Sequence, residues 1–322
     1  PGQSEPEARH HSDLSLFLWG LRRLARDVLP GSWTPVHEAW LLVLTMPLAV
    51  RGFWNGQSNP LVSALILLAA AALVRQCWWA AAGCLAVAVL LKLSPIAIAL
   101  LLVCLWPREL AWRMGIALCI GLAVPFLTQT PGYVLSQYGA WLEHLGATSQ
   151  KRWPSFRDVW TVWELVAGSV SVTAYRIAQL MAGAAAAAWC LRQHRRSKTA
   201  VASVTLALAI GTAYLMLFWP AVEAATYVLV APMLAWAVCA AAETRRGDFL
   251  ILSAFLLTGI FQYGAVERLV ARWTVYAGTA LPVGSALFAL WVVLHGPAVV
   301  ARHMPGSSKT VRTDELPART IP

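Results

Sequence analysis

The chain has 322 residues, of which 59% are hydrophobic and only 12% carry a charge. Ordinary soluble domains contain about twice that charged share, and no soluble core hides so much apolar surface, so the composition excludes a mainly water-soluble protein. The formal net charge is +10, but the basic residues are spread through short loops between apolar runs. That distribution is typical of membrane topology and argues against nucleic acid as a partner.

Ten apolar runs predict an all-α fold, a polytopic transmembrane helical bundle that crosses the bilayer about ten times. Several runs are shorter than the roughly 20 residues that span a bilayer, so their boundaries are approximate. The cysteines lie in or beside these runs, which indicates neither a disulfide framework nor a metal cluster. The runs lie near residues 36–50, 60–74, 77–91, 95–106, 112–127, 173–191, 200–219, 224–242, 248–264 and 275–295.

The chain is predicted to begin on the cytoplasmic side, with a polar segment and an amphipathic helix within residues 1–35. That helix, over residues 14–28, either lies on the inner membrane surface or is the end of a span whose beginning is missing. The sequence starts with Pro1 and shows no initiator methionine or cleavable signal, so we expect it to lack its natural N-terminal part. The remaining predicted units are transmembrane helices over 36–127, an outer interfacial loop over 128–172, transmembrane helices over 173–295 and a cytoplasmic tail over 296–322.

Lysine and arginine gather on the cytoplasmic side of membrane proteins, and this rule orients the chain. With the N-terminus inside, the basic cluster over 192–198 lies in the cytoplasm and the loop 128–172 lies outside. Residues 77–106 form either one kinked helix or two short helices that meet at Lys92. A single helix would move the 192–198 cluster outside, so we expect two short helices that form a hairpin at Lys92. The protein is thus predicted to lie in the cytoplasmic (inner) membrane with its active side facing outward.

The outer loop contains two amphipathic pieces, over 134–145 and 156–166, which predict a segment resting on the membrane interface. Arg152, Arg157 and Asp158 lie between and beside them, among several tryptophans. Arginines can clamp a phosphate, and indole faces can stack on sugar rings. The alternative is an aromatic belt whose cations bind the headgroups of membrane lipids.

A short outer turn carries three carboxamides, Asn55, Gln57 and Asn59, between two apolar helices. Carboxamides both donate and accept hydrogen bonds, which suits the hydroxyl groups of a sugar. The alternative is a capping turn, in which Asn59 precedes Pro60 at the start of the next helix.

Two charged residues border apolar helices. Lys92 lies where a cation is costly unless it reaches the interface or finds a partner, so it either holds the phosphate of a lipid-linked donor or extends its ammonium to the interface. Glu223 begins an otherwise apolar helix on the outer face. Its carboxylate either orients an acceptor hydroxyl or pairs with Lys92, or it only complements the positive end of the helix.

The chain carries in order the run from Asn55 to Pro60, a basic break at Arg75, the segment Leu91-Lys92-Leu93-Ser94-Pro95, and Arg108. Together these segments resemble glycosyltransferase family 87. The later segment 220–227, which contains Glu223 and Tyr227, is similar to a related bacterial pattern. The resemblance implies a GT-C-type membrane enzyme that moves a hexose, often mannose, from a polyprenyl-phosphate donor to a glycan or glycolipid acceptor on the outer side.

The resemblance also implies roles for individual residues. Asn55, Gln57, Asn59, Lys92, Arg152, Arg157 and Tyr227 are the expected substrate-binding residues, with no cofactor and no metal. The general base of such enzymes is usually an acidic residue in the first outer loop, but residues 51–59 contain neither Asp nor Glu. Either the base lies upstream of this sequence, or Glu223 or Asp158 takes its role, or the protein is not catalytic.

Two other functions remain open from the sequence. A transporter or flippase of lipid-linked or amphipathic substrates would carry paired charges in mid-membrane and repeated halves, and no internal repeat is visible. A non-catalytic membrane scaffold is the third possibility, favoured if no catalytic carboxylate exists.

Overall fold

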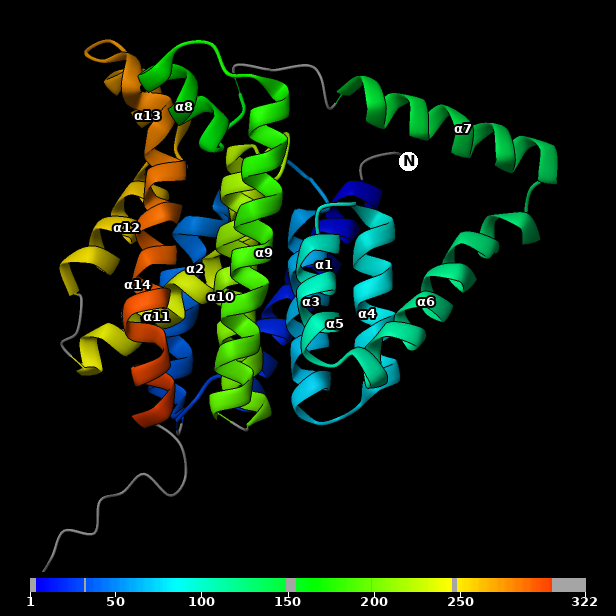
Figure 1. The fold of residues 1–322 in the computed structure, drawn as a ribbon, viewed down its shortest axis with the longest axis horizontal. Coiled ribbons are helices and arrows are strands. Elements are labelled where there is room, and N and C mark those ends of the chain that lie inside the picture. Colours follow the sequence, from blue (N-terminus) through cyan, green and yellow to red (C-terminus); the bar gives the residue numbers. More distant parts are fainter. Residues whose placement is uncertain (1–3, 32, 149–154, 198, 245–247, 303–322) are drawn as a thin grey trace, which may run out of the picture.

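The computed structural model describes residues 4–31, 33–148, 155–197, 199–244 and 248–302, and every regular element in them is a helix (Figure 1). This confirms the all-α fold. The elements are α1 (Ser4–Arg23), η1 (Leu24–Val28), α2 (Pro35–Trp54), α3 (Asn59–Val74), α4 (Trp78–Leu91), α5 (Ile96–Leu105), α6 (Pro107–Ala123), η2 (Val124–Leu127), α7 (Pro131–Thr148), α8 (Val159–Ala167), α9 (Val172–Ser197), α10 (Ala200–Phe218), η3 (Ala224–Leu229), α11 (Ala231–Thr244), α12 (Asp248–Ile260), α13 (Gly264–Val270), η4 (Val275–Thr279) and α14 (Ala280–Arg302).

Three helices in the described part of the chain are long and apolar enough to cross a membrane, at Pro107–Leu127, Ala200–Phe218 and Tyr276–Arg302. A fourth span results if α12 and α13, which meet at a bend of 101°, count as one. Helices α3, α4 and α5 are apolar but shorter. The apolar helices support an integral membrane protein, while the number of about ten passes stays a prediction.

Helix α10 lies at the centre of the bundle and packs against α3, α5, α9 and α14. Its residues are mostly apolar, which suits a helix surrounded by other helices or by lipid, and here most of them are buried inside the bundle. Close approach depends on small residues. Gly211 of α10 lies against Ile98 and Leu101 of α5, where an added Cβ would be 3.3 Å from either side chain.

Helices α4, α5 and α6 alternate in direction between the two ends of the bundle. Trp79 of α4 stacks edge-on with Trp112 of α6 at 5.1 Å, and Leu90 near the end of α4 touches Gly121 near the end of α6. These two helices are therefore parallel, so α5 must return between them. This confirms two short helices in place of one kinked helix, separated by the turn 92–95.

Helix α1 does not lie on the surface of the bundle. Phe17 and Leu24 are fully buried, and Gly20 lies against the backbone of Ala64 in α3. The Phe17 ring meets Phe53, near the end of α2, at 5.4 Å. Helix α1 thus runs parallel to α3, and its beginning lies at the upper end of the bundle as drawn in Figure 1. This differs from the expected helix on the inner membrane surface, because the apolar stripe of 14–28 is covered by α3. The cytoplasmic start of residues 1–35 stays a prediction.

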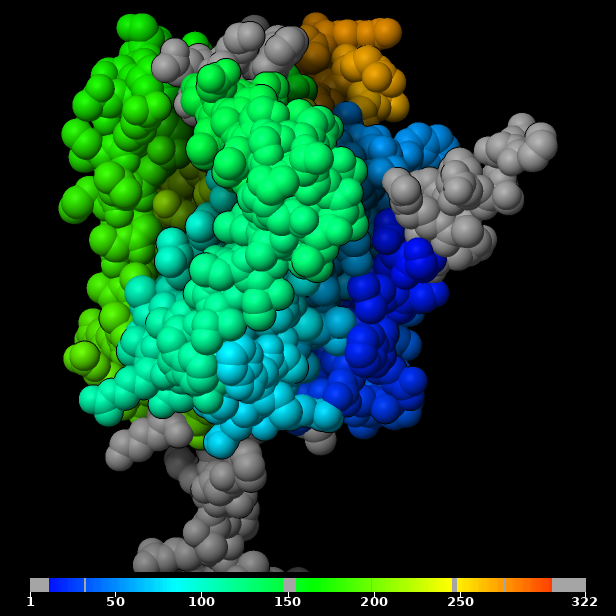
Figure 2. Space-filling model, turned by 90° about the vertical axis from the view of Figure 1, so that its right-hand side faces the viewer, coloured from blue at the N-terminus to red at the C-terminus, as the bar shows by residue number. Residues whose placement is uncertain are grey.

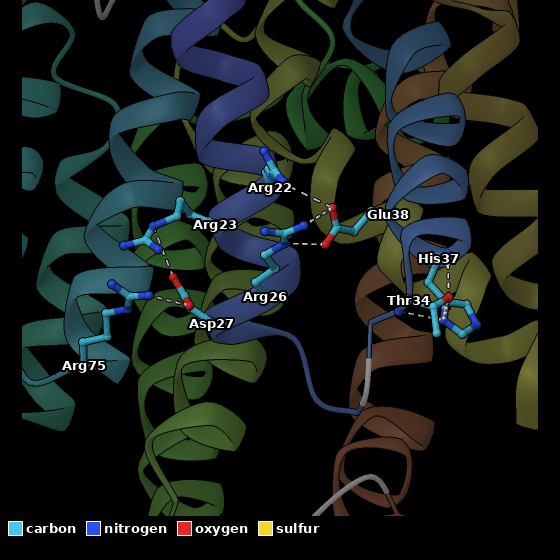
Figure 3. A network of polar contacts seen from close by, with 8 residues as sticks. All are labelled: Arg22, Arg23, Arg26, Asp27, Thr34, His37, Glu38 and Arg75. Carbon is cyan, nitrogen blue, oxygen red and sulfur yellow. Dashed lines mark hydrogen bonds and ion pairs between the residues drawn. The ribbon is translucent and has the colours of Figure 1, made fainter.

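A network of ion pairs gathers at the lower end of the bundle (Figure 3). Arg75, just after α3, donates to Asp27 of η1 at 2.9 Å, and Arg26 donates to Glu38 of α2 at 2.5 Å. These pairs tie η1 to the helices on both sides. Figure 3 shows the whole group, which comprises Arg22, Arg23, Arg26, Asp27, Thr34, His37, Glu38 and Arg75.

The long loop and the predicted inner basic cluster lie at opposite ends of the bundle, as the charge distribution predicts. Arg157 of the loop donates its backbone N–H to Val222 at the upper end, whereas His194 of the cluster contacts Trp106 at the lower end. The cluster's last member, Lys198, lies outside the described residues.

The two amphipathic pieces of the outer loop are helices, α7 and α8, as predicted. Figure 2 shows α6 and α7 crossing one face of the molecule in front of α4, and α7 extends away from the bundle in Figure 1. Leu135 and Leu142 of α7 are each 61% exposed. Apolar side chains left open in this way suit contact with lipid.

Candidate functional site

Four polar side chains form a continuous chain at the upper end of the bundle. Lys92 Nζ donates to Asn59 Oδ1 at 2.6 Å, and Asn59 Nδ2 donates to Gln57 Oε1 at 2.6 Å. Gln57 Nε2 in turn donates to Glu223 Oε2 at 3.4 Å. We call Gln57, Asn59, Lys92 and Glu223 the polar chain. It joins three segments that are far apart in the sequence and ends in a cation on one side and a carboxylate on the other.

Local sequence explains how each member reaches this position. Asn59 begins α3, with Pro60 after it, and its buried amide also donates to the backbone oxygen of Ala225 at 3.2 Å. Lys92 follows the last residue of α4 in extended conformation, which turns its side chain out of the helix. Ala221 has a φ of 63°, a left-handed conformation that costs an alanine free energy and bends the chain between α10 and Glu223.

The electrostatics of the polar chain favour a bound anion. Lys92 is half-buried in the turn outside α4 and α5, and burial lowers the pKa of its ammonium while the carboxylate of Glu223 opposes that shift. The ammonium donates its hydrogen bond to a neutral carboxamide, and among the described residues Glu223 is the carboxylate that favours the charge of Lys92. A phosphate next to Lys92 would stabilise its charged form.

Asn55, the third carboxamide of the turn, does not join the polar chain. It is exposed, and its backbone N–H closes the end of α2 by donating to Arg51 and Phe53 oxygens. Asn55 therefore ends α2, whereas Asn59 contacts both Lys92 and Gln57. The capping alternative concerned Asn59, which does begin α3 before Pro60 while its side chain joins the polar chain.

Arg157 fastens the outer loop beside Glu223. Its guanidinium pairs with Glu267 of α13, and its backbone N–H donates to Val222 at 2.7 Å. The hydroxyl of fully buried Tyr227 donates to the backbone oxygen of Arg157 at 3.0 Å. These contacts give Arg157 and Tyr227 an anchoring role next to the polar chain. Glu267 lies 110 residues from Arg157, so this ion pair could not be read from the local sequence.

Asp158 is fully buried at the start of α8. Its Oδ1 accepts hydrogen bonds from the backbone N–H of Thr161 at 3.2 Å and from the Thr161 hydroxyl at 3.3 Å. This is the geometry of a helix N-cap and not that of an exposed base. Arg152, the remaining expected site residue, lies outside the described residues.

An apolar groove of about 390 Å³ runs along the bundle between α5, α9 and α10. Small residues of α9 keep it open, and Leu100 and Leu180 line its walls. The small residues are Gly183, Ala184, Ala186 and Ala187. Its α5 wall begins at Ile96, four residues after Lys92, and Trp219, four residues before Glu223, lines it as well. The groove therefore starts near the polar chain. Sequence analysis missed it, since alanine-rich stretches suggest only close helix packing.

The polar chain and the groove together suit an amphipathic molecule with an anionic head and an apolar tail. The cation can balance the head, the two carboxamides can bind hydroxyl groups, and the carboxylate can accept a proton. Within the described residues no group of three His, Cys, Asp or Glu side chains is placed to hold a metal ion.

Comparison with known proteins identifies a family. Residues 12–220 match glycosyltransferase family 87, which covers both Gln57 and Lys92 but ends just before Glu223. No curated protein matches the chain. No solved structure matches it either.

Proposed function

The chain belongs to glycosyltransferase family 87 and is a membrane glycosyltransferase, and we propose that it transfers a mannose-like hexose from a polyprenyl-phosphate donor. The acceptor is a glycan or glycolipid on the outer face of the inner membrane. Family membership favours an enzyme over the transporter and the scaffold that the sequence left open. About ten passes follow if the shorter apolar helices also cross the bilayer.

The observation that carries this proposal is an apolar groove whose wall on α5 begins four residues after Lys92. A polyprenyl phosphate joins a long isoprenoid tail to a phosphate, so its two ends need an apolar channel and a cation close together. The groove between α5, α9 and α10 supplies the first, and Lys92, four residues before Ile96, supplies the second.

The polar chain provides the groups for the transfer. In this reaction an acceptor hydroxyl attacks the anomeric carbon, the bond from that carbon to the phosphate oxygen breaks, and the electron pair stays on the phosphate. Lys92 stabilises the leaving phosphate, and Gln57 and Asn59 bind sugar hydroxyls. Glu223, the carboxylate joined to the polar chain, takes the proton of the acceptor.

The groove is tested with a matched pair of substitutions on α9. Ala184 and its neighbour Ala185 are both exposed, but Ala184 lines the groove and Ala185 does not. Ala184→Phe should fill the groove and raise the KM for a labelled farnesyl-phosphate mannose in proteoliposomes, while Ala185→Phe should leave it unchanged. Transfer of label to a glycolipid extract is the readout. Equal KM values for the two variants would remove the tail from this groove.

The outward orientation has its own test. Exposed Ser169 follows α8 at the upper end, and Ser197 ends α9 at the lower end. In a variant without natural cysteines, a cysteine at Ser169 should react with an impermeant thiol reagent from the outside, and one at Ser197 only after the membrane is opened. The reverse pattern would place the active side inward.

A further inference from the structure

We propose that Arg51 and Arg268 form a second anion site at the upper end of the bundle, which binds the phosphate group of a ligand. The site lies between the end of α2 and α13 and shares no residue with the polar chain. It does not depend on the proposed function.

The two guanidinium groups converge on one glycine. A Cβ placed on Gly264, the first residue of α13, would lie 3.6 Å from Nη1 of Arg51 and 3.6 Å from Nη1 of Arg268. These two nitrogens are therefore no more than about 7 Å apart. A phosphate between them would accept a hydrogen bond of about 2.7–2.9 Å from each, which fits that separation.

Neither arginine is neutralised by the described part of the chain. Arg51 donates to the backbone oxygen of Gln262 at 3.1 Å, and no carboxylate pairs with it or with Arg268 among the described residues. Glu267, the acidic residue next to Arg268, is engaged by Arg157 instead. Two like charges held this close repel each other unless an anion lies between them.

Gln262 is a second, independent sign of a ligand. Its side chain is 2% exposed, and both its amide nitrogen and its amide oxygen lack a hydrogen-bond partner. A buried amide with neither group satisfied is rare and costs free energy unless a ligand or water completes it. Through its backbone oxygen Gln262 directly contacts Arg51, so the unsatisfied amide belongs to the residue that joins the two elements of the site.

The surroundings favour a lipid phosphate. Trp54, one helical turn after Arg51, is 86% exposed, and Tyr263, next to Gln262, is 46% exposed. Exposed Trp and Tyr are typical of the level at which headgroups lie. Arginine binds phosphate with a planar pair of donors, which suits the two convergent guanidinium groups.

The site is separate from the polar chain although both lie near the end of α2. Gly52 packs against Ala225 and Val228 of η3, on the side of α2 that faces the polar chain. Arg51, the adjacent residue, projects about 100° away around the helix and meets the turn between α12 and α13.

Binding to the purified full chain in neutral detergent tests the proposal, with dihexanoyl phosphatidylglycerol and inorganic phosphate as separate probes. Wild type should bind at least one probe saturably. Arg51→Gln and Arg268→Gln should each weaken that binding tenfold or more. Arg272→Gln, a matched loss of charge at an exposed arginine close by, should change it less than twofold. Tighter binding of phosphatidylglycerol identifies a lipid headgroup, and equal binding identifies free phosphate.

Gln262→Leu leaves the surface charge unchanged, so its effects on Tm and on probe binding cannot come from a loss of charge. It should raise the Tm of the protein without a probe and weaken binding of the probe. Arg268 is exposed, so Arg268→Gln folds even if Arg51→Gln does not. Absence of saturable binding, or a loss in Arg272→Gln as large as in Arg268→Gln, would overturn the site.

Discussion

Replacing Lys92 with methionine should weaken the binding of a polyprenyl phosphate while leaving the fold intact. Methionine keeps most of the side-chain volume beside α5 but removes the ammonium. In the structure that ammonium donates to Asn59 Oδ1 at 2.6 Å and is half-buried, so it is positioned and not freely mobile.

The size of the effect depends on the strength of the hydrogen bond between the ammonium and the phosphate. A hydrogen bond between charged groups contributes about 1.5–3 kcal/mol, which corresponds to a roughly 10- to 150-fold change in affinity. The substitution also leaves Asn59 Oδ1 without its donor, at about 1–3 kcal/mol for a buried acceptor. Relief from burying a charge offsets part of that, so the stability of the variant should change little.

The assay is equilibrium binding of farnesyl phosphate to the full chain in neutral detergent, with the Tm measured on the same samples. Lys92→Arg is the control, because it keeps a cation at the same place and should retain most of the affinity. Unchanged affinity in a Lys92→Met protein of normal Tm would refute the argument that Lys92 balances the phosphate.

Three further predictions concern the base, the helix packing and pH. Asp158→Asn should keep transfer activity, since Asn caps a helix as well as Asp does. Glu223→Gln should lower kcat at least tenfold at unchanged Tm, because it removes the carboxylate that accepts the proton. A larger loss of kcat in Asp158→Asn than in Glu223→Gln would exchange the two roles. Gly284→Ala should destabilise the protein by about 1–3 kcal/mol in denaturant unfolding, because the new Cβ would lie 2.7 Å from the Thr258 side chain. Gly83→Ala has nothing within 4 Å of its Cβ and should stabilise the protein by about 0.5–1 kcal/mol. Equal effects of the two substitutions would contradict the packing of α12 on α14. Burial lowers the pKa of Lys92 in the folded protein below its unfolded value of 10.5, so between these two pKa values the unfolded chain binds more protons than the folded one. The free energy of unfolding of the wild type should therefore rise with pH in that interval. Lys92→Met should flatten this rise, and an unchanged slope would show that Lys92 is not its source.

Much of the fold follows from local sequence. Apolar runs long enough for helices are separated by Pro, Gly and charged residues, and these signals act within a few residues of each other. The break at Lys92-Leu93-Ser94-Pro95 correctly predicted two helices, and the periodic stripes of the outer loop correctly predicted α7 and α8. Polar residues in apolar surroundings also marked Lys92 and Glu223, because an uncompensated charge there is costly.

The tertiary structure decided which of these residues meet. Gln57 and Glu223 are 166 residues apart, and Arg157 and Glu267 are 110 apart, so neither pairing leaves a trace in local spacing. The same holds for α1, whose apolar stripe fits a membrane surface and the side of α3 equally well. The groove beside α9 depends on three helices that approach from separate parts of the chain. The sequence sets the energy cost of each exposed or buried group, but only the packing of distant helices determines which partner removes that cost.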